Sequence, residues 1–134
     1  MSDTAPSPLP IGTSDFEALR DAGQIYVDKT AIVYQLARLR QKFVLTRPGR
    51  FGKTLLVSTF ASLFKKGLTC FSGLAIEKLW KDRTYTVVTI DFSDIKNFEN
   101  IQDFYTRFDD RLIESFEPAG FHYDESDRQS VIWQ

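Results

Sequence analysis

The fold expected for this chain is decided by residues 42–56, Lys42-Phe43-Val44-Leu45-Thr46-Arg47-Pro48-Gly49-Arg50-Phe51-Gly52-Lys53-Thr54-Leu55-Leu56. They open with an apolar, β-prone run typical of a buried strand, and a short basic loop then leads into a helix that begins with Gly-Lys-Thr. In such a loop the backbone N–H groups converge on the β-phosphate of a nucleotide, the lysine reaches the β- and γ-phosphates, and the threonine hydroxyl coordinates magnesium. The stretch therefore predicts a phosphate-binding loop, a variant of the Walker A motif.

The loop departs from the usual pattern at its start. Arg47 stands where that pattern has a glycine, and Pro48 follows it. A side chain and a fixed proline φ thus replace the freest backbone position. Spacing alone leaves a basic surface turn as an alternative, but the motif also requires a strand before it and a helix after it, and both are expected here.

The helix expected after the loop spans residues 53–66 and ends in two lysines followed by Gly67. Its apolar residues recur on one face at helical spacing. A second strand is expected at residues 85–92, apolar enough to lie inside a sheet. The predicted fold class is therefore α/β: a P-loop NTPase-like parallel sheet with flanking helices, in an incomplete, N-terminal portion of the domain.

Three further helices, and a short helical piece around residues 77–80, are expected around these elements. The first begins at a capping box formed by Ser14 and Glu17, the second spans residues 30–40, and the third spans residues 98–117 along a stripe of apolar residues. Residues 1–10 are small, polar and rich in proline, which predicts a flexible segment. Residues 11–134 are then the ordered part.

Composition excludes several classes of protein. The chain has 134 residues, 43% of them hydrophobic, and a formal net charge of −1, so no global field favours nucleic acid or a membrane. Cys70 is the only cysteine and His122 the only histidine, which excludes disulfide frameworks and Cys/His zinc sites within the chain. The sequence contains no stretch long and apolar enough to span a membrane and no signal peptide, and it indicates a cytoplasmic protein.

Five blocks of sequence together resemble the predicted AAA-ATPase-like family of bacterial proteins. They are Leu9-Pro10-Ile11-Gly12-Thr13-Ser14-Asp15-Phe16, Tyr26-Val27-Asp28-Lys29-Thr30, Thr46-Arg47-Pro48-Gly49-Arg50-Phe51-Gly52-Lys53-Thr54-Leu55, Phe71-Ser72-Gly73-Leu74 and Ile90-Asp91-Phe92-Ser93. The resemblance spans about Leu9 to Phe116, and members of the family tolerate an Arg-Pro start to the loop. Members look like P-loop ATPases, often followed by a nuclease-like domain of the PD-(D/E)XK type.

The resemblance implies ATP and Mg²⁺ as ligands, with Lys53 on the phosphates and Thr54 on the magnesium. The implied nucleotide-binding residues are those of the loop: Arg47, Pro48, Gly49, Arg50, Phe51, Gly52, Lys53, Thr54 and Leu55. Tyr26, Asp28 and Lys29 match another block, and two roles are open for them. They either fix the helix that leads into the loop or border the nucleotide.

The family's catalytic residues are the part of its pattern that this sequence matches least. Family members usually carry an apolar strand ending in an acidic cluster well beyond this point, and no such cluster occurs before Gln134. Asp91 ends an apolar run and is the alternative candidate for the Walker B carboxylate. We therefore expect ATP binding with little or no hydrolysis by this chain alone, because the metal and the attacking water lack a clear second partner.

Two rival functions remain open at this point. The chain could be a non-catalytic module that acts through its Phe-rich surfaces on a protein partner or a second copy. Less favoured is a nucleic-acid-binding fragment that uses the cations Arg38, Arg40, Lys42, Arg47, Arg50 and Lys53. Nucleotide-dependent stabilisation and salt dependence of binding separate these functions from ATP binding.

Overall fold

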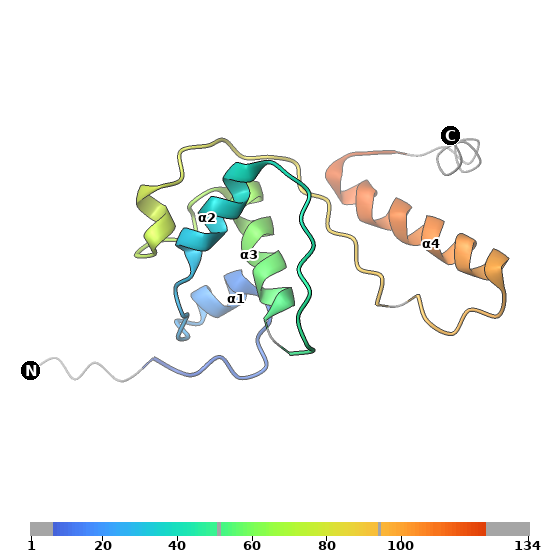
Figure 1. Cartoon of the computed structure of the whole chain (residues 1–134), viewed down its shortest axis with the longest axis horizontal. Coiled ribbons are helices and arrows are strands. Elements are labelled where there is room, and N and C mark those ends of the chain that lie inside the picture. Colours follow the sequence, from blue (N-terminus) through green and yellow to red (C-terminus); the bar gives the residue numbers. More distant parts are fainter. Residues whose placement is uncertain (1–6, 51, 94, 123–134) are drawn as a thin grey trace, which may run out of the picture. The chain divides into compact units, whose positions relative to one another are not determined.

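The computed structural model describes residues 7–50, 52–93 and 95–122 (Figure 1). The chain divides into two compact units, Met1–Tyr85 and Thr86–Gln134, called here the N-terminal and C-terminal units. Of the segment expected to be flexible, residues 1–6 lie outside the described part. Within residues 7–10, the Pro8 carbonyl accepts a hydrogen bond from the N–H of Ile25 at 3.0 Å.

The N-terminal unit is built from short helices around one apolar core (Figure 1). They are α1 (Phe16–Asp21), α2 (Thr30–Leu39), α3 (Lys53–Lys66) and the 3₁₀ helix η1 (Ala75–Lys78). Each contributes at least one buried side chain to a cluster consisting of Phe16, Val33, Leu63, Phe71, Leu74, Ile76 and Trp80. The helix after the basic loop, α3, has the bounds predicted from its apolar spacing and its terminal Gly67.

Helix α1 begins one residue later than its predicted capping box. Asp15, not Ser14, is the N-cap, and its carboxylate accepts a hydrogen bond from the Ala18 N–H at 2.8 Å. Arg20 in the last turn donates to the carbonyls of Cys70 and Ser72 at 3.1 and 2.6 Å. These bonds fix α1 against the loop that precedes η1.

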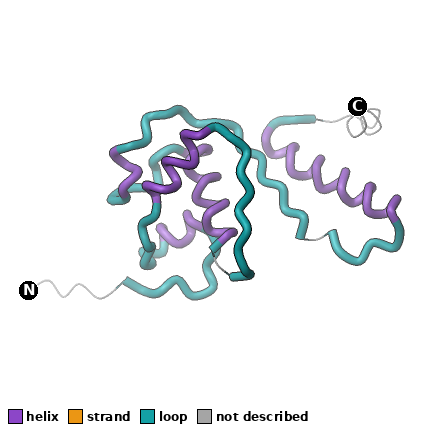
Figure 2. The backbone as a smooth tube through the Cα atoms, viewed as in Figure 1, coloured by secondary structure: helices purple, strands orange, loops and turns teal. Residues whose placement is uncertain are grey.

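The predicted parallel sheet is wrong for the part of the chain that the structure describes. Residues 7–50, 52–93 and 95–122 contain no β-strand (Figure 2). Residues 42–46 have no ladder partner and are exposed, with Val44 at 89% exposure. Of residues 85–92, Tyr85 donates its N–H to the Phe64 carbonyl at the end of α3, at 2.7 Å. A strand exists only where a neighbouring strand accepts and donates its backbone hydrogen bonds, and a β-prone composition does not supply that neighbour.

The C-terminal unit is dominated by α4 (Ile101–Phe116), which continues into the 3₁₀ helix η2 (Glu117–Ala119). Asn100 caps α4 by accepting a hydrogen bond from the Asp103 N–H at 2.9 Å. The predicted apolar stripe is present as aromatic contacts, including Phe104 against Phe108 and Phe92 stacked on Phe108. No described residue of this unit is buried. Among the described residues, no helix has the length and apolarity to cross a bilayer.

Candidate functional site

The basic loop turns sharply into α3 through two left-handed residues. Arg50 has φ 63° and Gly52, the N-cap of α3, has φ 73°. Glycine adopts this conformation without strain, whereas a side chain at position 52 would be strained there even though the space around it is open. The Gly52 carbonyl accepts the first helical hydrogen bond, from the Leu56 N–H at 3.0 Å.

Among the described residues, no side chain caps the start of α3. Gly52 offers no side-chain acceptor, and the first turn of the helix contains no acidic residue. Helix geometry leaves the first N–H groups without an acceptor inside the helix, and the helix dipole adds positive potential at this end. The start of α3 therefore favours an anion.

The side chain of Lys53 bends back across the loop. Its ammonium Nζ donates a hydrogen bond to the Arg47 carbonyl at 2.8 Å. This bond joins the first residue of the predicted loop to the first residue of α3. It keeps a positive charge beside the N-terminus of the helix, since Lys53 is exposed and no acidic partner offsets it in the first turn.

A cavity of about 580 Å³ opens beside this turn. Its lining combines the loop with a segment that precedes α1: Gly12, Thr13, Ser14, Arg50, Gly52, Lys53, Thr54 and Leu55. Two of these side chains are cations, and the described residues that form the lining include no Asp or Glu. The hydroxyl groups of Thr13, Ser14 and Thr54 add neutral donors and acceptors. The cavity is thus suited to phosphate oxygens.

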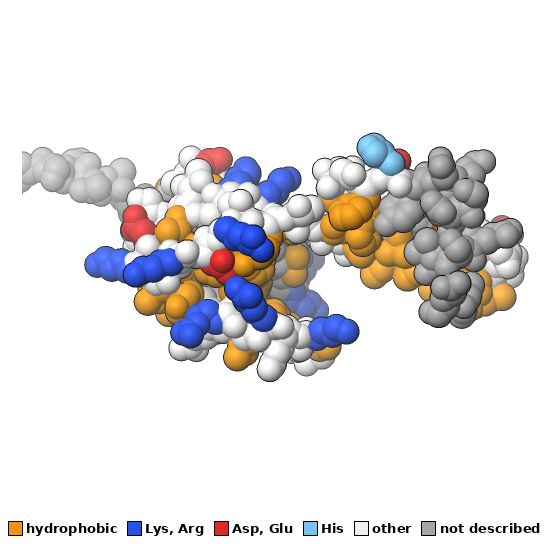
Figure 3. Space-filling view, turned by 90° about the horizontal axis from the view of Figure 1, so that it is seen from above, with side chains coloured by type: hydrophobic (Ala, Val, Ile, Leu, Met, Phe, Trp, Pro, Cys, Tyr) orange, Lys and Arg blue, Asp and Glu red, His pale blue; other side chains and the backbone are white. Residues whose placement is uncertain are grey.

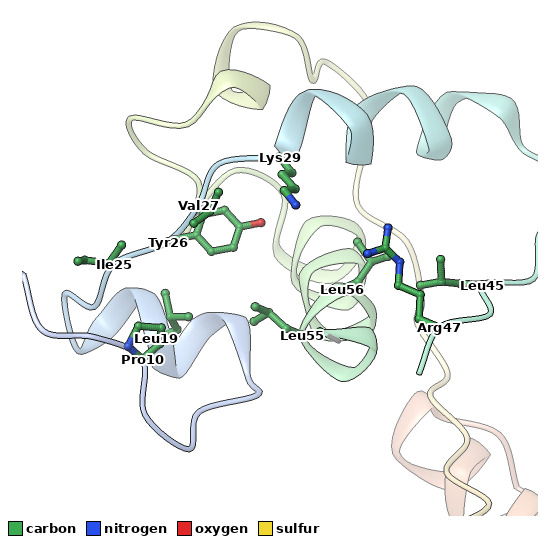
Figure 4. Close-up of a pocket in the computed structure, with 11 residues that line it drawn as sticks. Pro10, Leu19, Ile25, Tyr26, Val27, Lys29, Leu45, Arg47, Leu55 and Leu56 are labelled. Carbon is green, nitrogen blue, oxygen red and sulfur yellow. The ribbon is translucent and has the colours of Figure 1, made fainter. Parts of the chain in front are cut away.

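A second cavity, of about 300 Å³, also borders the first turn of α3 (Figure 4). It shares Gly52 and Leu55 with the first cavity. Most of its lining is apolar, and its polar groups come from Tyr26, Lys29 and Arg47. In Figure 4 the Lys29 side chain extends from the start of α2 into the space between Tyr26 and α3. Tyr26 and Lys29 therefore border the loop.

Asp28, from the same sequence block, connects two backbone segments. One carboxylate oxygen accepts from the N–H and the hydroxyl of Thr30 at 2.8 and 2.6 Å, and the other accepts from the Ala75 N–H at 2.7 Å. Thr30 in turn accepts from the Ile76 N–H at 3.1 Å. Burial raises the pKa of Asp28, but the hydrogen bonds from Thr30 and Ala75 outweigh it and lower the pKa below its usual value. Asp28 thus fixes the start of α2 on η1.

The Tyr26 ring packs edge-on against Phe16 with centroids 5.2 Å apart. Burial raises the pKa of its phenol, and the nearby charge of Asp28 acts in the same direction, against a hydrogen bond with Thr59 that lowers it. The phenol of Tyr26 is therefore protonated, and its ring, packed against Phe16, forms an aromatic wall of the smaller cavity. Two residues of one block thus have different roles, one in fixing the backbone and one in lining a cavity.

Not all predicted site residues reach these cavities. Arg47, Arg50, Gly52, Lys53, Thr54 and Leu55 line one or both of them. Pro48 and Gly49 lie in the loop but line neither, and Phe51 lies outside the described residues. Over the described ranges, no group of three or more His, Cys, Asp or Glu side chains is arranged to hold a metal ion.

Asp91 belongs to the C-terminal unit, and its carboxylate closes a local turn. Oδ1 accepts a hydrogen bond from the Ser93 N–H at 2.9 Å. The hydrogen bonds from Ser93 lower the pKa of Asp91, and the charges of Arg111 and Lys96 lower it further. The carboxylate is thus ionised, and one of its oxygens closes this turn.

Residues 12–14 are the part of the site that motif reasoning missed. Gly12, Thr13 and Ser14 line the larger cavity, about 35 positions before the first residue of the loop, Arg47. Ser58 of α3 links Phe16, just after this segment, to the helix, because its hydroxyl accepts from the Phe16 N–H at 3.0 Å and donates to the Leu55 carbonyl at 2.9 Å. The only sequence signal for them was their block in the family resemblance.

Comparison with known proteins agrees with that resemblance. Residues 10–132 match the family described as "Predicted AAA-ATPase". An uncharacterized protein in the vnfD 5′ region of Azotobacter chroococcum mcd 1 is 38% identical over 86 residues, which are 63% of this chain and 17% of that protein. The chain thus spans about a sixth of the length of the curated relative that it matches. No solved structure matches it. Because the family match covers nearly the whole sequence, the chain belongs to the predicted AAA-ATPase family.

Proposed function

We propose that this chain binds ATP with Mg²⁺ through a variant Walker A loop at residues 47–55. The observation that carries the proposal is the Lys53 ammonium, held 2.8 Å from the Arg47 carbonyl beside the N-terminus of α3. Family membership supports nucleotide as the ligand, because the family is one of predicted ATPases.

The hydrogen bond to the Arg47 carbonyl leaves Lys53 able to bind a phosphate. An ammonium has three donors, so Lys53 keeps one on the carbonyl and has others for the β- and γ-phosphate oxygens. The bond also restrains a long side chain that would otherwise lose rotamer freedom on binding. Lys53 is therefore partly preorganised for an anion.

The surrounding charges favour the same ligand. The two cavities at the start of α3 bring Lys29, Arg47, Arg50 and Lys53 near one helix terminus, and no carboxylate lines either of them among the described residues. A triphosphate offers the negative charge that this arrangement lacks.

The residues present fit magnesium only as part of a nucleotide complex. The Thr54 hydroxyl lines the cavity beside Lys53, and Mg²⁺ is usually bound by few protein ligands together with substrate phosphates and water. Bound there, the ion would neutralise phosphate charge. Thr54 would orient the complex, and Lys53 would hold the terminal phosphates.

We propose little or no ATP hydrolysis by this chain alone. The candidate second carboxylate, Asp91, is engaged by the Ser93 N–H in the C-terminal unit. We also propose that residues 11–134 are the N-terminal part of a larger ATPase domain. The relative from Azotobacter supports this, since the chain covers only 17% of it.

A thermal-shift series tests the proposal. ATP with Mg²⁺ at about 100 times its dissociation constant should add about 2.7 kcal/mol to the stability of the chain. Lys53→Ala should abolish this gain and leave the unliganded melting temperature nearly unchanged, because the lysine is exposed. Lys81→Ala removes an exposed lysine that lines neither cavity and should retain the full gain. A Lys53→Ala protein that ATP stabilises as much as the parent would refute the proposal.

A non-catalytic interaction module is the second candidate. Exposed apolar side chains at the start of α4 and just before it favour it, since Ile101 is 63% exposed and Phe98 48% exposed. This function predicts no nucleotide-dependent shift in melting temperature, with self-association or capture of a protein partner instead. Sedimentation with and without ATP and Mg²⁺ would separate the two candidates.

A further inference from the structure

The smaller cavity beside α3 has the character of a site for a flat apolar group. Its lining combines apolar side chains from the N-terminal segment, α1, residues 25–27, the extended residues before the loop, and α3 (Figure 4). They are Pro10, Leu19, Ile25, Val27, Leu45, Leu55 and Leu56, together with Tyr26. Ligand sites are commonly lined in this way, by apolar and aromatic side chains with a few polar groups that set orientation, and begin at about 300 Å³.

The position of this cavity is as informative as its lining. Gly52 and Leu55 line both cavities, so the apolar space and the cationic space meet at the first turn of α3. A molecule that spans this turn would have an anionic end beside Lys53 and an apolar end beside Tyr26. A nucleoside triphosphate has this division, since its phosphates are polyanionic and its base is a flat heteroaromatic ring.

We propose that the cavity lined by Leu19, Tyr26 and Leu45 binds the purine base of the nucleotide whose phosphates lie against Lys53. The inference rests on the proposed phosphate site and adds a site for the base, which the phosphate site does not contact. The Tyr26 ring, held edge-on against Phe16, gives the base a fixed aromatic wall. Lys29 and Arg47 supply donors for ring nitrogens and ribose oxygens.

Tripolyphosphate separates the two parts of the ligand, because it carries the phosphates without the base. Isothermal titration calorimetry of the 134-residue chain, in the presence of Mg²⁺, compares the affinity for tripolyphosphate with the affinity for ATP. ATP should bind at least about tenfold more tightly than tripolyphosphate, the margin being the contribution of base and ribose. Lys53→Ala should abolish the binding of both ligands.

Two neighbouring residues provide a matched pair of variants. Leu45 lines the cavity and is 40% exposed, whereas Val44 is 89% exposed and lines neither cavity. Leu45→Trp fills the apolar space. It should weaken the affinity for ATP by about tenfold and change the affinity for tripolyphosphate by less than about twofold. Val44→Trp should leave both affinities unchanged. Val27→Trp fills the same cavity from another segment, at a position 71% exposed, and serves if Leu45→Trp does not fold.

The outcomes distinguish this inference from the proposed function. If the parent binds tripolyphosphate as tightly as ATP, or if Leu45→Trp and Val27→Trp both leave ATP affinity unchanged, the base does not occupy the cavity and the phosphate site stands. An equal loss of both ligands in both cavity-filling variants also overturns the base assignment. If neither ligand binds the parent chain, the phosphate site and the base site both fail.

Discussion

The N-terminal and C-terminal units both contain amphipathic helices, yet only the N-terminal unit buries the apolar faces. Phe16, Phe71, Leu63 and Ile76 in the N-terminal unit are completely buried, whereas no described residue after Tyr85 is buried. The stripe on α4 is as regular as any in the N-terminal unit, but its aromatic rings contact one another and rings close by in the same unit, those of Phe92, Phe98 and Phe121. An apolar stripe therefore predicts a helix, while burial depends on segments distant in sequence that pack against it.

Charge separates the two units as well. Residues 1–85 contain 13 Lys and Arg against 7 Asp and Glu, and residues 86–134 contain 4 against 11. The net charge of −1 conceals this division. On the face seen in Figure 3, Lys and Arg predominate over Asp and Glu across the N-terminal unit, and apolar side chains lie on the surface of the C-terminal unit. The unit with the basic loop at residues 47–55 is thus the basic one, which suits the anionic ligand proposed for it.

The largest expected effect comes from the core of the N-terminal unit. Phe71→Ala should destabilise this unit by about 3–5 kcal/mol, because the ring is fully buried and leaves a cavity. Phe98→Ala in the C-terminal unit should cost about 1 kcal/mol or less, since that ring is half exposed and contacts Phe104. Urea unfolding followed by Trp80 fluorescence, with Trp133 replaced by Phe, measures the loss in the N-terminal unit, and the amide signals of α4 in ¹H–¹⁵N NMR spectra across the same urea series measure the loss in the C-terminal unit. Equal losses would contradict the difference in burial between the units.

A smaller effect is expected where Asp28 joins α2 to η1. Asp28→Asn should cost about 1 kcal/mol at about pH 7, because the amide cannot accept from both Thr30 and the Ala75 N–H. The pKa of Asp28 is lowered by folding, so its contribution is complete above the usual pKa of 3.8 and is lost as pH falls through the lower folded pKa. The parent and variant should therefore converge in stability below about pH 3.8, as measured by urea midpoints across pH.

Asp103 gives the matched control in the other unit. A hydrogen bond from Arg107 lowers the pKa of Asp103 on the exposed surface of α4. Asp103→Asn should leave the Trp80 transition unchanged at every pH, because exposed pairs contribute little and this one lies in the C-terminal unit. An Asp28→Asn protein that keeps its deficit undiminished in acid would show that the carboxylate charge is not what stabilises the junction.

The smallest effect is expected at Asp91. Asp91→Asn should change ATP affinity by less than about twofold, and phosphate release by parent and variant should both stay at background, because this carboxylate accepts from Ser93 in its own unit. A steady-state phosphate-release assay measures this. Enzyme-like turnover by the parent, lost in Asp91→Asn, would instead identify Asp91 as the Walker B carboxylate.

Local features of the fold were predictable, and non-local ones were not. Helix α3 has its predicted bounds because apolar spacing and Gly67 lie within the segment itself. The strands predicted at residues 42–46 and 85–92 are absent, because pairing depends on a partner that composition does not specify. In the same way, the loop motif predicted Lys53 as a site residue, and that stays a prediction, whereas the lining supplied by residues 12–14 depends on how distant segments pack.

The central claim is that the phosphates of ATP bind at the start of α3, and backbone amide shifts in ¹H–¹⁵N NMR spectra test it most directly. Adding ATP with Mg²⁺ should shift the N–H signals of Gly52, Lys53, Thr54 and Leu55 most strongly, because phosphate oxygens would accept from this turn. The signals of α4 should stay nearly unchanged, and Lys53→Ala should abolish the shifts. Shifts confined to α4, or none in residues 52–55 at saturating ATP, would contradict the account.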